Sequence, residues 1–464
     1  MALYNPTTVS KQRGPEEKRA AQQARVLALL RRYGWNATSF QVLEPGLRYW
    51  FGGDDTCVAY VDTGKSFVVA GAPIAGEAQV QQAAERFAAF ARRCGRRLRF
   101  FAVADRFLEL APFDALQVGE QPCWDPAAWP QILKGSRSLR EQLRRARAHG
   151  VAVRLLDAQE LEGPARAGVE ALIARWLGSR RMAPMGFLVE VHPFSFAGER
   201  RYFVAEREGR VVGFLAAVPI YARGGWFFED LLRDPEAPNG TAELLVDAAM
   251  RDVAAGGAGY VTLGLAPLAG VSGWLASMGR LTRGLYDFSG LAAFKAKLRP
   301  QAWEAIFLAY PRGELGVVAL SDTLSAFSRR GLLRFGLETL ARVPNVVIQA
   351  LALLLVPWTV ALAFAPAREF PAPWVQAAWV AFDVVLFALL MALVRRWNHA
   401  LATALASIVT ADAAITLAQA LAWNLPRARG AADVLVACVA VLAPSVAALL
   451  LWRARWHRRR WLQR

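Results

Sequence analysis

Apolar residues follow two different patterns along the 464-residue chain. The first pattern consists of four long apolar stretches near the carboxyl end: Val346–Ala365, Trp374–Val394, Ala400–Trp423 and Ala432–Trp452. Each has about 20 residues, the length that crosses a hydrocarbon core of about 30 Å. The core of one soluble domain rarely produces four such stretches in succession. This region is therefore predicted to be an all-α bundle of about four transmembrane helices.

The second pattern, which precedes residue 346, consists of short apolar runs separated by amphipathic segments. Cys57–Val61, Ser66–Ala70 and Leu98–Val103 are typical of strands, and Ala78–Cys94 has the spacing of a helix. A short amphipathic helix, Arg19–Tyr33, is expected to lead into this series. Strands that alternate with helices predict a mixed α/β domain.

A second series of similar size and order begins after residue 200. Its expected strands and helix are Tyr202–Glu206, Val211–Ile220, Trp226–Leu231, the helix Thr241–Ala255, and the strand Tyr260–Leu265. Two mixed α/β halves joined by a helix form the simplest architecture that accounts for the repetition.

The joining segment, Lys134–Arg147, is strongly basic. Four of its arginines fall within one narrow face at 100° per residue: Arg137, Arg140, Arg144 and Arg147. Ser136 is the expected N-cap and Gly150 the expected end. Such a stripe can bind a phosphate backbone. It can equally be a solvated face or a surface lying on anionic lipid. Because the arginines are expected on the outer face, reversing Arg140 and Arg144 to glutamate should leave folding intact.

Composition indicates the class of binding partner and argues against some kinds of site. A formal net charge of +17 points to polyanionic partners, either nucleic acid or anionic lipid. The four cysteines are scattered without a CxxC pair, which fits a reducing compartment and not a zinc site: Cys57, Cys94, Cys123 and Cys438. With only four histidines, two of them flanking apolar stretches, neither a metal site nor a histidine-based triad is expected.

The distribution of arginine predicts the orientation in a membrane. Arginines concentrate before the first apolar stretch, between the second and third, and in the tail, at Arg329, Arg330, Arg334, Arg342, Arg395, Arg396 and residues 453–464. The other two loops contain only Arg368, and then Arg427 with Arg429. By the positive-inside rule, the soluble domain and both termini are expected in the cytoplasm. The charged N-terminal segment lacks the apolar run of a signal peptide.

Two segments superficially suggest phosphate-binding loops. Thr63–Ser66 has the end of a P-loop, but Ala59 stands where the earlier glycine is needed and a strand follows. The turn Arg233–Gly240 precedes the helix at Thr241, where coenzyme A would bind in an acetyltransferase. Its two prolines lack N–H donors and its two acids would repel a pyrophosphate. No coenzyme A donor, and no other cofactor, is therefore expected.

Several segments together resemble the synthase domain of the phosphatidylglycerol lysyltransferases. They are Phe227–Gly240, Gly259–Leu268, Leu285–Lys297 and Pro300–Trp303, with the basic segment Ser136–Gly150 at the position of that family's inter-lobe helix. Gly71–Gly76 is similar to the family's early Gly-Asp-Pro turn, with Ala72 in place of the aspartate. The resemblance extends from Gly34 to Pro311 in consistent order.

The resemblance implies two tandem acetyltransferase-like lobes that move an amino acid from aminoacyl-tRNA to the hydroxyl of a membrane lipid, most simply phosphatidylglycerol. Because the donor ester is already activated, the resemblance implies neither metal nor nucleotide. The enzyme must orient the hydroxyl, help remove its proton and stabilise the oxyanion. It would do so at a bacterial inner membrane, with an anionic lipid as acceptor.

Residue roles follow from the same resemblance. Its motifs imply that Asp230 and Arg233, together with Lys295 or Lys297 near the reacting ester, are catalytic. Asn239 and Glu243, together with Gly264 and Pro267, are implied to line the aminoacyl site. Lys134 and the four stripe arginines would bind tRNA. For Asp230 and Arg233 a structural ion pair remains the alternative, and for the two lysines a solvated or lipid-facing charge.

The expected domains are a tail and helix (1–33), the first lobe (34–132), the basic helix (133–150), the second lobe (151–315), a basic juxtamembrane linker (316–345), the membrane domain (346–453) and a basic tail (454–464). Family members usually carry many spans before the synthase domain, and those spans flip the product. Here the apolar stretches follow it.

Two acidic residues lie near the middle of predicted spans, Asp383 and Asp412. An ionised carboxylate is costly there, so both are expected to face the interior of the bundle, as a helix contact or along a headgroup path.

Two other functions for the protein stay open. One is transfer to a peptidoglycan precursor or small amine from another donor, and the other is a non-catalytic lipid transporter with a sensing domain.

Overall fold

The structure is a computed structural model. It describes residues 15–462 except 158–159, 181–184, 277–287, 329–330, 332–333, 337, 340–343 and 367–368. The chain divides near residue 332 into a sheet unit and a helical unit. The amino-terminal part of the motif Leu285–Lys297 and the arginines 329, 330, 342, 368 and 464 lie outside the described residues.

The first half of the sheet unit contains the predicted elements and several that the sequence did not indicate. Its helices and strands are α1 (Pro15–Tyr33), β1 (Arg48–Gly53), β2 (Thr56–Asp62), β3 (Ser66–Ala70), α2 (Glu77–Arg93), β4 (Arg97–Ala104), α3 (Asp105–Leu110) and β5 (Asp114–Trp124). The amphipathic helix α2 buries Phe87 and its neighbouring alanines against the sheet residues Tyr60, Phe67 and Phe100. Burial of such aromatic side chains is a large source of stability.

Two helices link the halves and the second half follows. Its elements are α4 (Trp129–Gly135), α5 (Arg137–Ala148), β6 (Ala152–Leu156), α6 (Pro164–Ser179), β7 (Arg201–Arg207), β8 (Arg210–Ile220), β9 (Gly225–Arg233), α7 (Thr241–Ala255), β10 (Tyr260–Thr262), β11 (Ala266–Pro267), α9 (Phe288–Lys297) and β12 (Ala302–Tyr310). The last helix of the sheet unit is α10 (Gly316–Phe327), which lies inside the segment expected to be a juxtamembrane linker.

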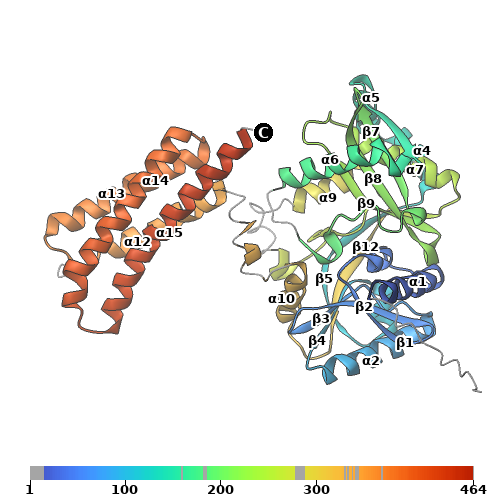
Figure 1. Cartoon of the computed structure of the whole chain (residues 1–464), viewed down its shortest axis with the longest axis horizontal. Helices are drawn as coiled ribbons and strands as arrows, with labels where there is room; N and C mark the ends of the chain where they lie inside the picture. Colours follow the sequence, from blue (N-terminus) through green and yellow to red (C-terminus); the bar gives the residue numbers. More distant parts are fainter. Residues whose placement is uncertain are drawn as a thin grey trace, which may run out of the picture. The chain divides into compact units, whose positions relative to one another are not determined.

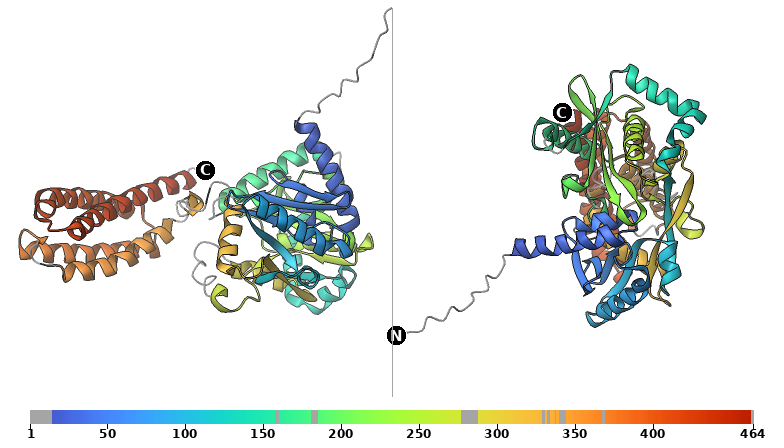
Figure 2. Two further views of the ribbon diagram at one scale, coloured as in Figure 1. Left: turned by 90° about the horizontal axis from the view of Figure 1, so that it is seen from below. Right: turned by 90° about the vertical axis from the view of Figure 1, so that its right-hand side faces the viewer.

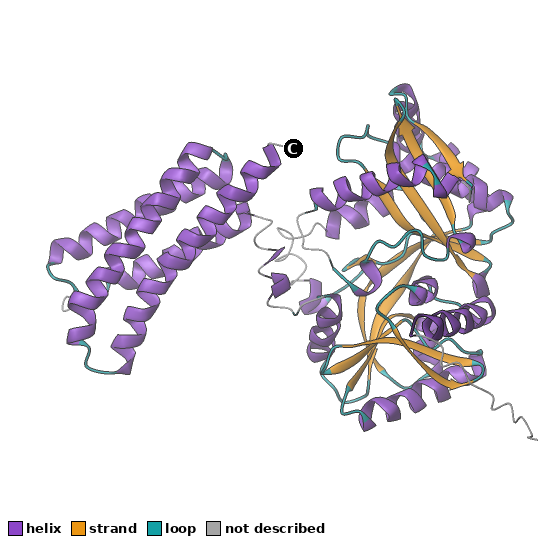
Figure 3. Cartoon of the chain, viewed as in Figure 1, coloured by secondary structure: helices purple, strands orange, loops and turns teal. Residues whose placement is uncertain are grey.

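Both halves share one sheet, with the strand order β1-β2-β3-β4-β12-β5-β10-β9-β8-β7-β6. The strands form a continuous band that runs through the whole unit, with helices packed on it (Figures 1 and 3). The last strand, β12, comes from the end of the unit but lies between β4 and β5 of the first half. The two halves are therefore joined by β12 and β5 as well as by the predicted basic helix.

The predicted strand Tyr260–Leu265 is shorter in the structure. β10 ends at Thr262, because residues 263–265 leave the sheet before β11 pairs with β5. The carbonyl groups of these three residues bond a lysine side chain instead of a neighbouring strand.

The helical unit contains α12 (Pro344–Ala363), α13 (Pro373–Arg395), α14 (His399–Gln419) and α15 (Ala431–Leu462), which run side by side (Figure 2). Three segments of the described chain are long and apolar enough to cross a membrane: Pro373–Arg395, His399–Arg427 and Ala431–Arg455. The apolar part of α12, Ile348–Ala363, is shorter. The predicted class, a two-lobed α/β domain followed by an all-α unit, is confirmed.

Candidate functional site

The candidate site forms where strands β9 and β10 separate. The two strands pair in parallel over three residues, ending with Thr262 opposite Phe227. Beyond Thr262 the chain turns away, so the carboxyl-terminal part of β9 loses its neighbour on that side. Asp230 and Arg233 lie on this part of β9, and Gly264 and Pro267 lie on the departing segment. The structure thus places four predicted site residues around one divergence of strands.

Gly264 is required at this divergence by its backbone and by its surroundings. Its φ is +67°, and a Cβ would stand 2.6 Å from the ring of Phe227. A side chain at this position would therefore clash with β9 as well as strain the backbone. Pro267 lies in the two-residue strand β11, opposite Gly119 of β5.

Lys295 is held under the same segment by backbone carbonyl groups. Its ammonium donates to the carbonyl oxygens of Leu263, Gly264 and Leu265 at 2.9, 2.8 and 2.9 Å. Burial lowers the pKa of Lys295 to about 7, while the three carbonyl dipoles favour the charged form. All three N–H donors are used, so Lys295 shapes the divergence of the strands.

Lys297, two residues further on α9, has a different environment. Its ammonium lies 2.6 Å from Glu243, a buried carboxylate in the first turn of α7, and one third of the lysine side chain is exposed. Arg233 donates to the side-chain oxygen of Asn239 at 3.2 Å in the loop that leads to the same helix. The start of α7 therefore brings together a lysine, a glutamate, an arginine and an asparagine from the predicted set.

Asp230 belongs to a buried acidic cluster that the sequence did not reveal. The cluster consists of Glu44, Glu229 and Asp230 around the fully buried Arg200. A bulge in the pairing of β8 and β9 adds Glu229 as an extra residue beside Asp230. Arg200 pairs with Glu229, lies 3.8 Å from Glu44, and donates to the carbonyl oxygen of Ser195 at 2.8 Å.

The electrostatics of this cluster follow from its burial. Burial and the neighbouring charge of Glu229 raise the pKa of Glu44 to about 10 and that of Asp230 to about 8, while Arg200 opposes both shifts. One oxygen of Glu44 and one of Glu229 are buried without a hydrogen-bond partner among the described residues. Burial therefore favours the protonated form of Asp230, which does not form an ion pair with Arg233 within the part of the chain that the structure describes. Only Glu229, next to Asp230 in the sequence motif, could have suggested the cluster.

The basic helix α5 is present with the predicted ends. The Ser136 hydroxyl accepts from the Leu139 amide at 3.4 Å, and Gly150 ends the turn with φ of +77°. Leu139, Leu143 and Ala146 face the core, and the five predicted tRNA-binding residues are exposed: Lys134, Arg137, Arg140, Arg144 and Arg147.

Several of these arginines also have structural contacts. Arg140 donates to the carbonyl oxygen of Leu133 at 2.7 Å and to that of Lys134, which caps the end of α4. Arg144 pairs with Glu141 at 2.8 Å. Reversal of Arg140 to glutamate would place an acceptor against these two carbonyl oxygens, so such a variant would also perturb the end of α4.

Helix α7 connects the basic helix to the candidate site. Arg147 of α5 pairs at 3.1 Å with the buried Asp247, which also accepts from Trp129 at 2.9 Å. Asp247 lies one turn from Glu243, the partner of Lys297. At Gly240, where α7 begins, a Cβ would stand 2.2 Å from the backbone oxygen of Gln142 of α5. The two helices are thus in direct backbone contact.

The two acids that the sequence places near the middle of predicted spans lie in the helical unit. Asp383 is buried and accepts from Thr359 of α12 at 3.2 Å, and Asp412 accepts from Thr416 on its own helix at 3.2 Å. Asp383 therefore faces the interior of the bundle, as expected.

This geometry defines a class: a two-lobed α/β fold with a candidate site at a divergence of parallel strands, next to a basic inter-lobe helix. A sequence profile of the family "Phosphatidylglycerol lysyltransferase, C-terminal" matches residues 27–310. The match covers more than half of the chain, and the chain belongs to this family. The resemblance found in the sequence motifs is confirmed.

Individual relatives agree with this assignment. Phosphatidylglycerol lysyltransferase of Bacillus subtilis (strain 168) is 29% identical over 164 residues, which cover 33% of this chain and 18% of that protein. The chain thus spans less than one fifth of the length of the relative that it matches.

Two solved structures share the fold. A C-terminal domain assigned as lysylphosphatidylglycerol synthetase from Agrobacterium fabrum has a TM-score of 0.58 at 21% identity, covering 68% of this chain and 100% of that one. L-PGS from Bacillus licheniformis has a TM-score of 0.56 at 20% identity, covering 70% of this chain and 100% of that one.

Proposed function

We propose that this protein transfers an amino acid from aminoacyl-tRNA to the hydroxyl group of an anionic membrane lipid, most simply phosphatidylglycerol. The observation that carries the proposal is the family match over residues 27–310, which includes the whole divergence of strands and the basic helix. The relative from Bacillus subtilis is named for lysyl transfer to phosphatidylglycerol.

The reaction is an ester exchange. The lipid hydroxyl oxygen attacks the carbonyl carbon of the aminoacyl ester and loses its proton. The tetrahedral oxyanion then collapses, the bond to the terminal ribose oxygen of the tRNA breaks, and that oxygen takes a proton. No electrons are gained or lost, and the donor ester supplies the activation. The enzyme contributes orientation, proton transfer and charge stabilisation.

Residue roles are part of the proposal. Arg233, half-buried and oriented by Asn239, is suited to stabilise the oxyanion or a ribose phosphate. Lys297, one third exposed beside Glu243, is suited to donate the proton that the departing ribose oxygen needs. Lys295 and Gly264 hold the departing segment in place, and Asp230 lies at the buried end of the site.

The donor is proposed to bind along α5. Lys134 and the stripe arginines are exposed on the helix that contacts the start of α7, and α7 carries Glu243. A tRNA backbone on α5 would therefore deliver its acceptor end toward Lys297. Phosphate contacts of this kind position a nucleic acid without reading its sequence.

The helical unit is proposed to hold the protein in a bacterial inner membrane. Three described segments are long and apolar enough to cross it, and α12 would be the fourth span. The arginine distribution supports a cytoplasmic location for the sheet unit and both termini. The lobes, basic helix and membrane domain are proposed at the boundaries expected from the sequence.

The test uses the purified full chain in lipid vesicles with tRNA charged with labelled lysine or alanine. The proposal expects label in the lipid fraction, abolished by prior RNase treatment. Arg233→Gln should reduce transfer by at least tenfold, whereas Arg86→Gln, an exposed arginine on α2, should not. Label transferred with RNase present, or label appearing only on a soluble amine, would overturn the proposal.

A further inference from the structure

A groove of about 340 Å³ lies at the edge of the first half, away from the divergence of β9 and β10. It is lined by the end of α2, the start of β4 and the turn after β12: Ala88, Arg92, Gly95, Arg96, Arg97, Leu98, Pro311 and Glu314. Neither the sequence motifs nor the proposed reaction uses these residues. We call them the arginine groove.

The groove is lined by three guanidinium groups, of which Arg92 alone has no carboxylate partner among the described residues. Arg92, Arg96 and Arg97 line it, and Glu314 is the one carboxylate among its described lining residues. Arg96 pairs with Asp62 at 3.1 Å, and Arg97 donates to Asp322 at 2.5 and 2.8 Å. Arg92 is exposed on the last turn of α2. Guanidinium groups in such an arrangement are suited to bind phosphate oxygens.

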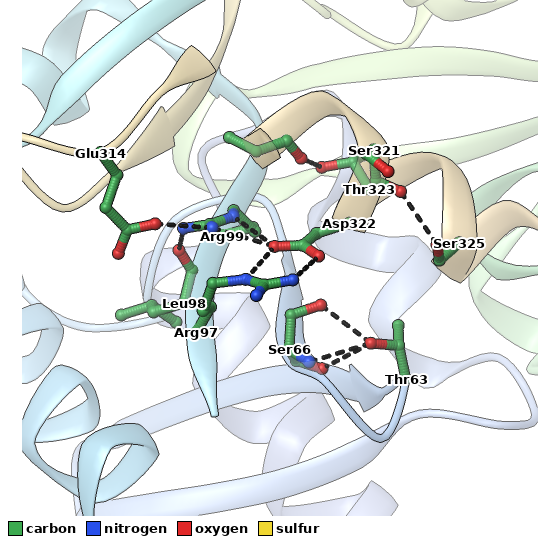
Figure 4. A network of polar contacts seen from close by, with 11 residues as sticks. Thr63, Ser66, Arg97, Leu98, Arg99, Glu314, Ser321, Asp322, Thr323 and Ser325 are labelled. Atoms are coloured by element: carbon green, nitrogen blue, oxygen red, sulfur yellow. Dashed lines mark hydrogen bonds and ion pairs between the residues drawn. The ribbon is translucent and has the colours of Figure 1, made fainter. Parts of the chain in front are cut away.

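The neighbouring helix α10 is fixed to the groove by a buried ion-pair network (Figure 4). Asp322 of α10 accepts from Arg97 and, at 3.1 Å, from the fully buried Arg99. Arg99 also pairs at 2.6 Å with Glu314, which lines the groove just before α10 begins. Breaking such a buried network is costly, so α10 has a fixed position beside the arginine groove.

The outer face of α10 and the residue before it carry three exposed apolar side chains, with Ser321 between them. Leu315, Val317 and Leu324 are 71%, 56% and 44% exposed, while Ala319, Asp322 and Thr323 face inward. Exposed apolar residues grouped beside a charged groove are unusual on a soluble surface and mark a site of contact. The chain then continues through Arg329, Arg330, Arg334 and Arg342 to the apolar helices of the helical unit.

We propose that the arginine groove and the outer face of α10 form a docking surface for the anionic membrane itself. A lipid phosphate binds between Arg92, Arg96 and Arg97, and Leu315, Val317 and Leu324 enter the headgroup region. Basic residues combined with an apolar helix face are the usual means of interfacial binding. The inference rests on the proposed membrane location and adds a second lipid contact outside the reacting site.

A nucleic-acid contact at this groove is less well supported. A phosphate backbone would accept hydrogen bonds from the arginines, but it would leave the apolar side chains of α10 exposed to water. Only a bilayer offers phosphate and apolar surface side by side, and α10 is joined to the helical unit by a basic segment.

The native cysteines provide a probe at the groove. Cys94 is exposed between Arg93 and the groove residue Gly95, whereas Cys57 and Cys123 are buried. The full chain with Cys438→Ser can therefore be labelled with a fluorophore at Cys94 and reconstituted into nanodiscs. The nanodiscs contain phosphatidylcholine alone or with one third phosphatidylglycerol, and spin-labelled lipid serves as quencher.

The proposal expects strong quenching at Cys94 in anionic nanodiscs and at least twofold weaker quenching in phosphatidylcholine. Arg92→Glu and Val317→Asp should each reduce quenching at least threefold. Arg93→Glu is the matched control, because Arg93 is the exposed neighbour of Arg92 and does not line the groove. Leu155→Asp, at an exposed leucine of β6, is the control for the apolar change.

Other outcomes would overturn the proposal. If the chain enters nanodiscs but Cys94 is not quenched, docking fails while membrane attachment stands. If the chain stays outside nanodiscs, both fail. Equal quenching in Arg92→Glu and Arg93→Glu would remove the groove from the contact. Weaker tRNA binding by Arg92→Glu with unchanged quenching would assign the groove to nucleic acid.

Discussion

Lys295 and Lys297 show how strongly environment separates two identical side chains. Lys295 is buried and bonded to three carbonyl groups, and Lys297 is partly exposed and paired with Glu243. Both side chains leave the same end of α9. The resemblance left open which lysine is near the reacting ester, and the contacts favour Lys297 for proton transfer and Lys295 for positioning.

Lys295→Met is expected to destabilise the sheet unit by about 2–5 kcal/mol, because three buried carbonyl groups lose their donor. Thermal unfolding of the detergent-solubilised chain measures this as a lower Tm. Lys134→Met removes an exposed lysine and should change the free energy of unfolding by less than about 0.5 kcal/mol. Equal effects of the two substitutions on Tm would show that the contacts of Lys295 with the carbonyl groups do not contribute to stability.

The buried carboxyls at Glu44 and Asp230 predict a specific dependence of stability on pH. Their raised pKa values, about 10 and 8, mean that the folded protein keeps protons that the unfolded chain releases above about pH 4–5. The unfolded state therefore binds fewer protons, and stability falls as pH rises from about 5 to about 7. Above pH 7 the lowered pKa of Lys295 opposes this decline, because the unfolded chain then keeps a proton on that lysine.

Glu44→Gln removes one of these two titrating groups. The decline in Tm between pH 5 and pH 7 should become shallower, by roughly half, since one of two carboxyls still titrates. Glu141→Gln is the control, because side-chain bonds from Arg144 and Arg145 lower the pKa of Glu141 to about 2. That variant should keep the full decline above pH 5. A decline as steep in Glu44→Gln as in the unmodified chain would contradict the assignment.

At the scale of elements, helix α5 both packs on the core and presents arginines to solvent. The sequence pattern does not tell which of these arginines also make structural contacts. Its apolar face packs on the core, and its arginines are exposed. Arg140 and Arg147 also bond α4 and α7, while Arg137 and Arg144 form no hydrogen bond or ion pair with another element among the described residues. A test of tRNA binding must therefore avoid Arg140 and Arg147.

The double reversal Arg137→Glu with Arg144→Glu should weaken tRNA binding at least tenfold at moderate salt. The log–log dependence of affinity on salt should become flatter by about 0.7–0.9 for each phosphate that the helix no longer neutralises. Filter binding at several salt concentrations measures both quantities. Arg86→Glu with Arg93→Glu makes the same charge change on α2 and should leave both nearly unchanged. Unaltered affinity in the α5 variant would remove this helix from the donor site.

At the scale of the whole molecule, the sheet unit is one continuous structure because β12 lies between β4 and β5. A substitution near β12 is therefore expected to affect the packing of both halves. Helix α10 is bonded to β4 through Asp322, so it is fixed to the sheet of this unit.

The proposed topology predicts opposite readings from reporters fused at Gly430 and at Arg464, because α15 alone separates them. Reporters at Gly331 and Glu369 should also read opposite sides if α12 is a span. Compartment-specific reporter activity in a bacterial host measures both pairs. Matching readings for the second pair would leave three spans and would move the carboxyl-terminal tail to the other side from the sheet unit.

The sequence by itself determined those features that depend on local pattern. The strand Ser66–Ala70 and the helix Thr241–Ala255 have the predicted ends, and Ser136 caps the basic helix as expected. Hydrophobic period, capping residues and apolar length act between near neighbours, so they can be read along the chain. Linear motifs likewise placed the chain in its family.

Only the tertiary structure decided what depends on residues far apart in the chain. The insertion of β12, the Arg200 cluster with Glu44, and the three carbonyl groups around Lys295 join distant segments. The same is true of the arginine groove, which combines α2, β4 and the turn after β12. A side chain's partner, burial and pKa are set by what folds against it, and no period or motif along one segment encodes that neighbour.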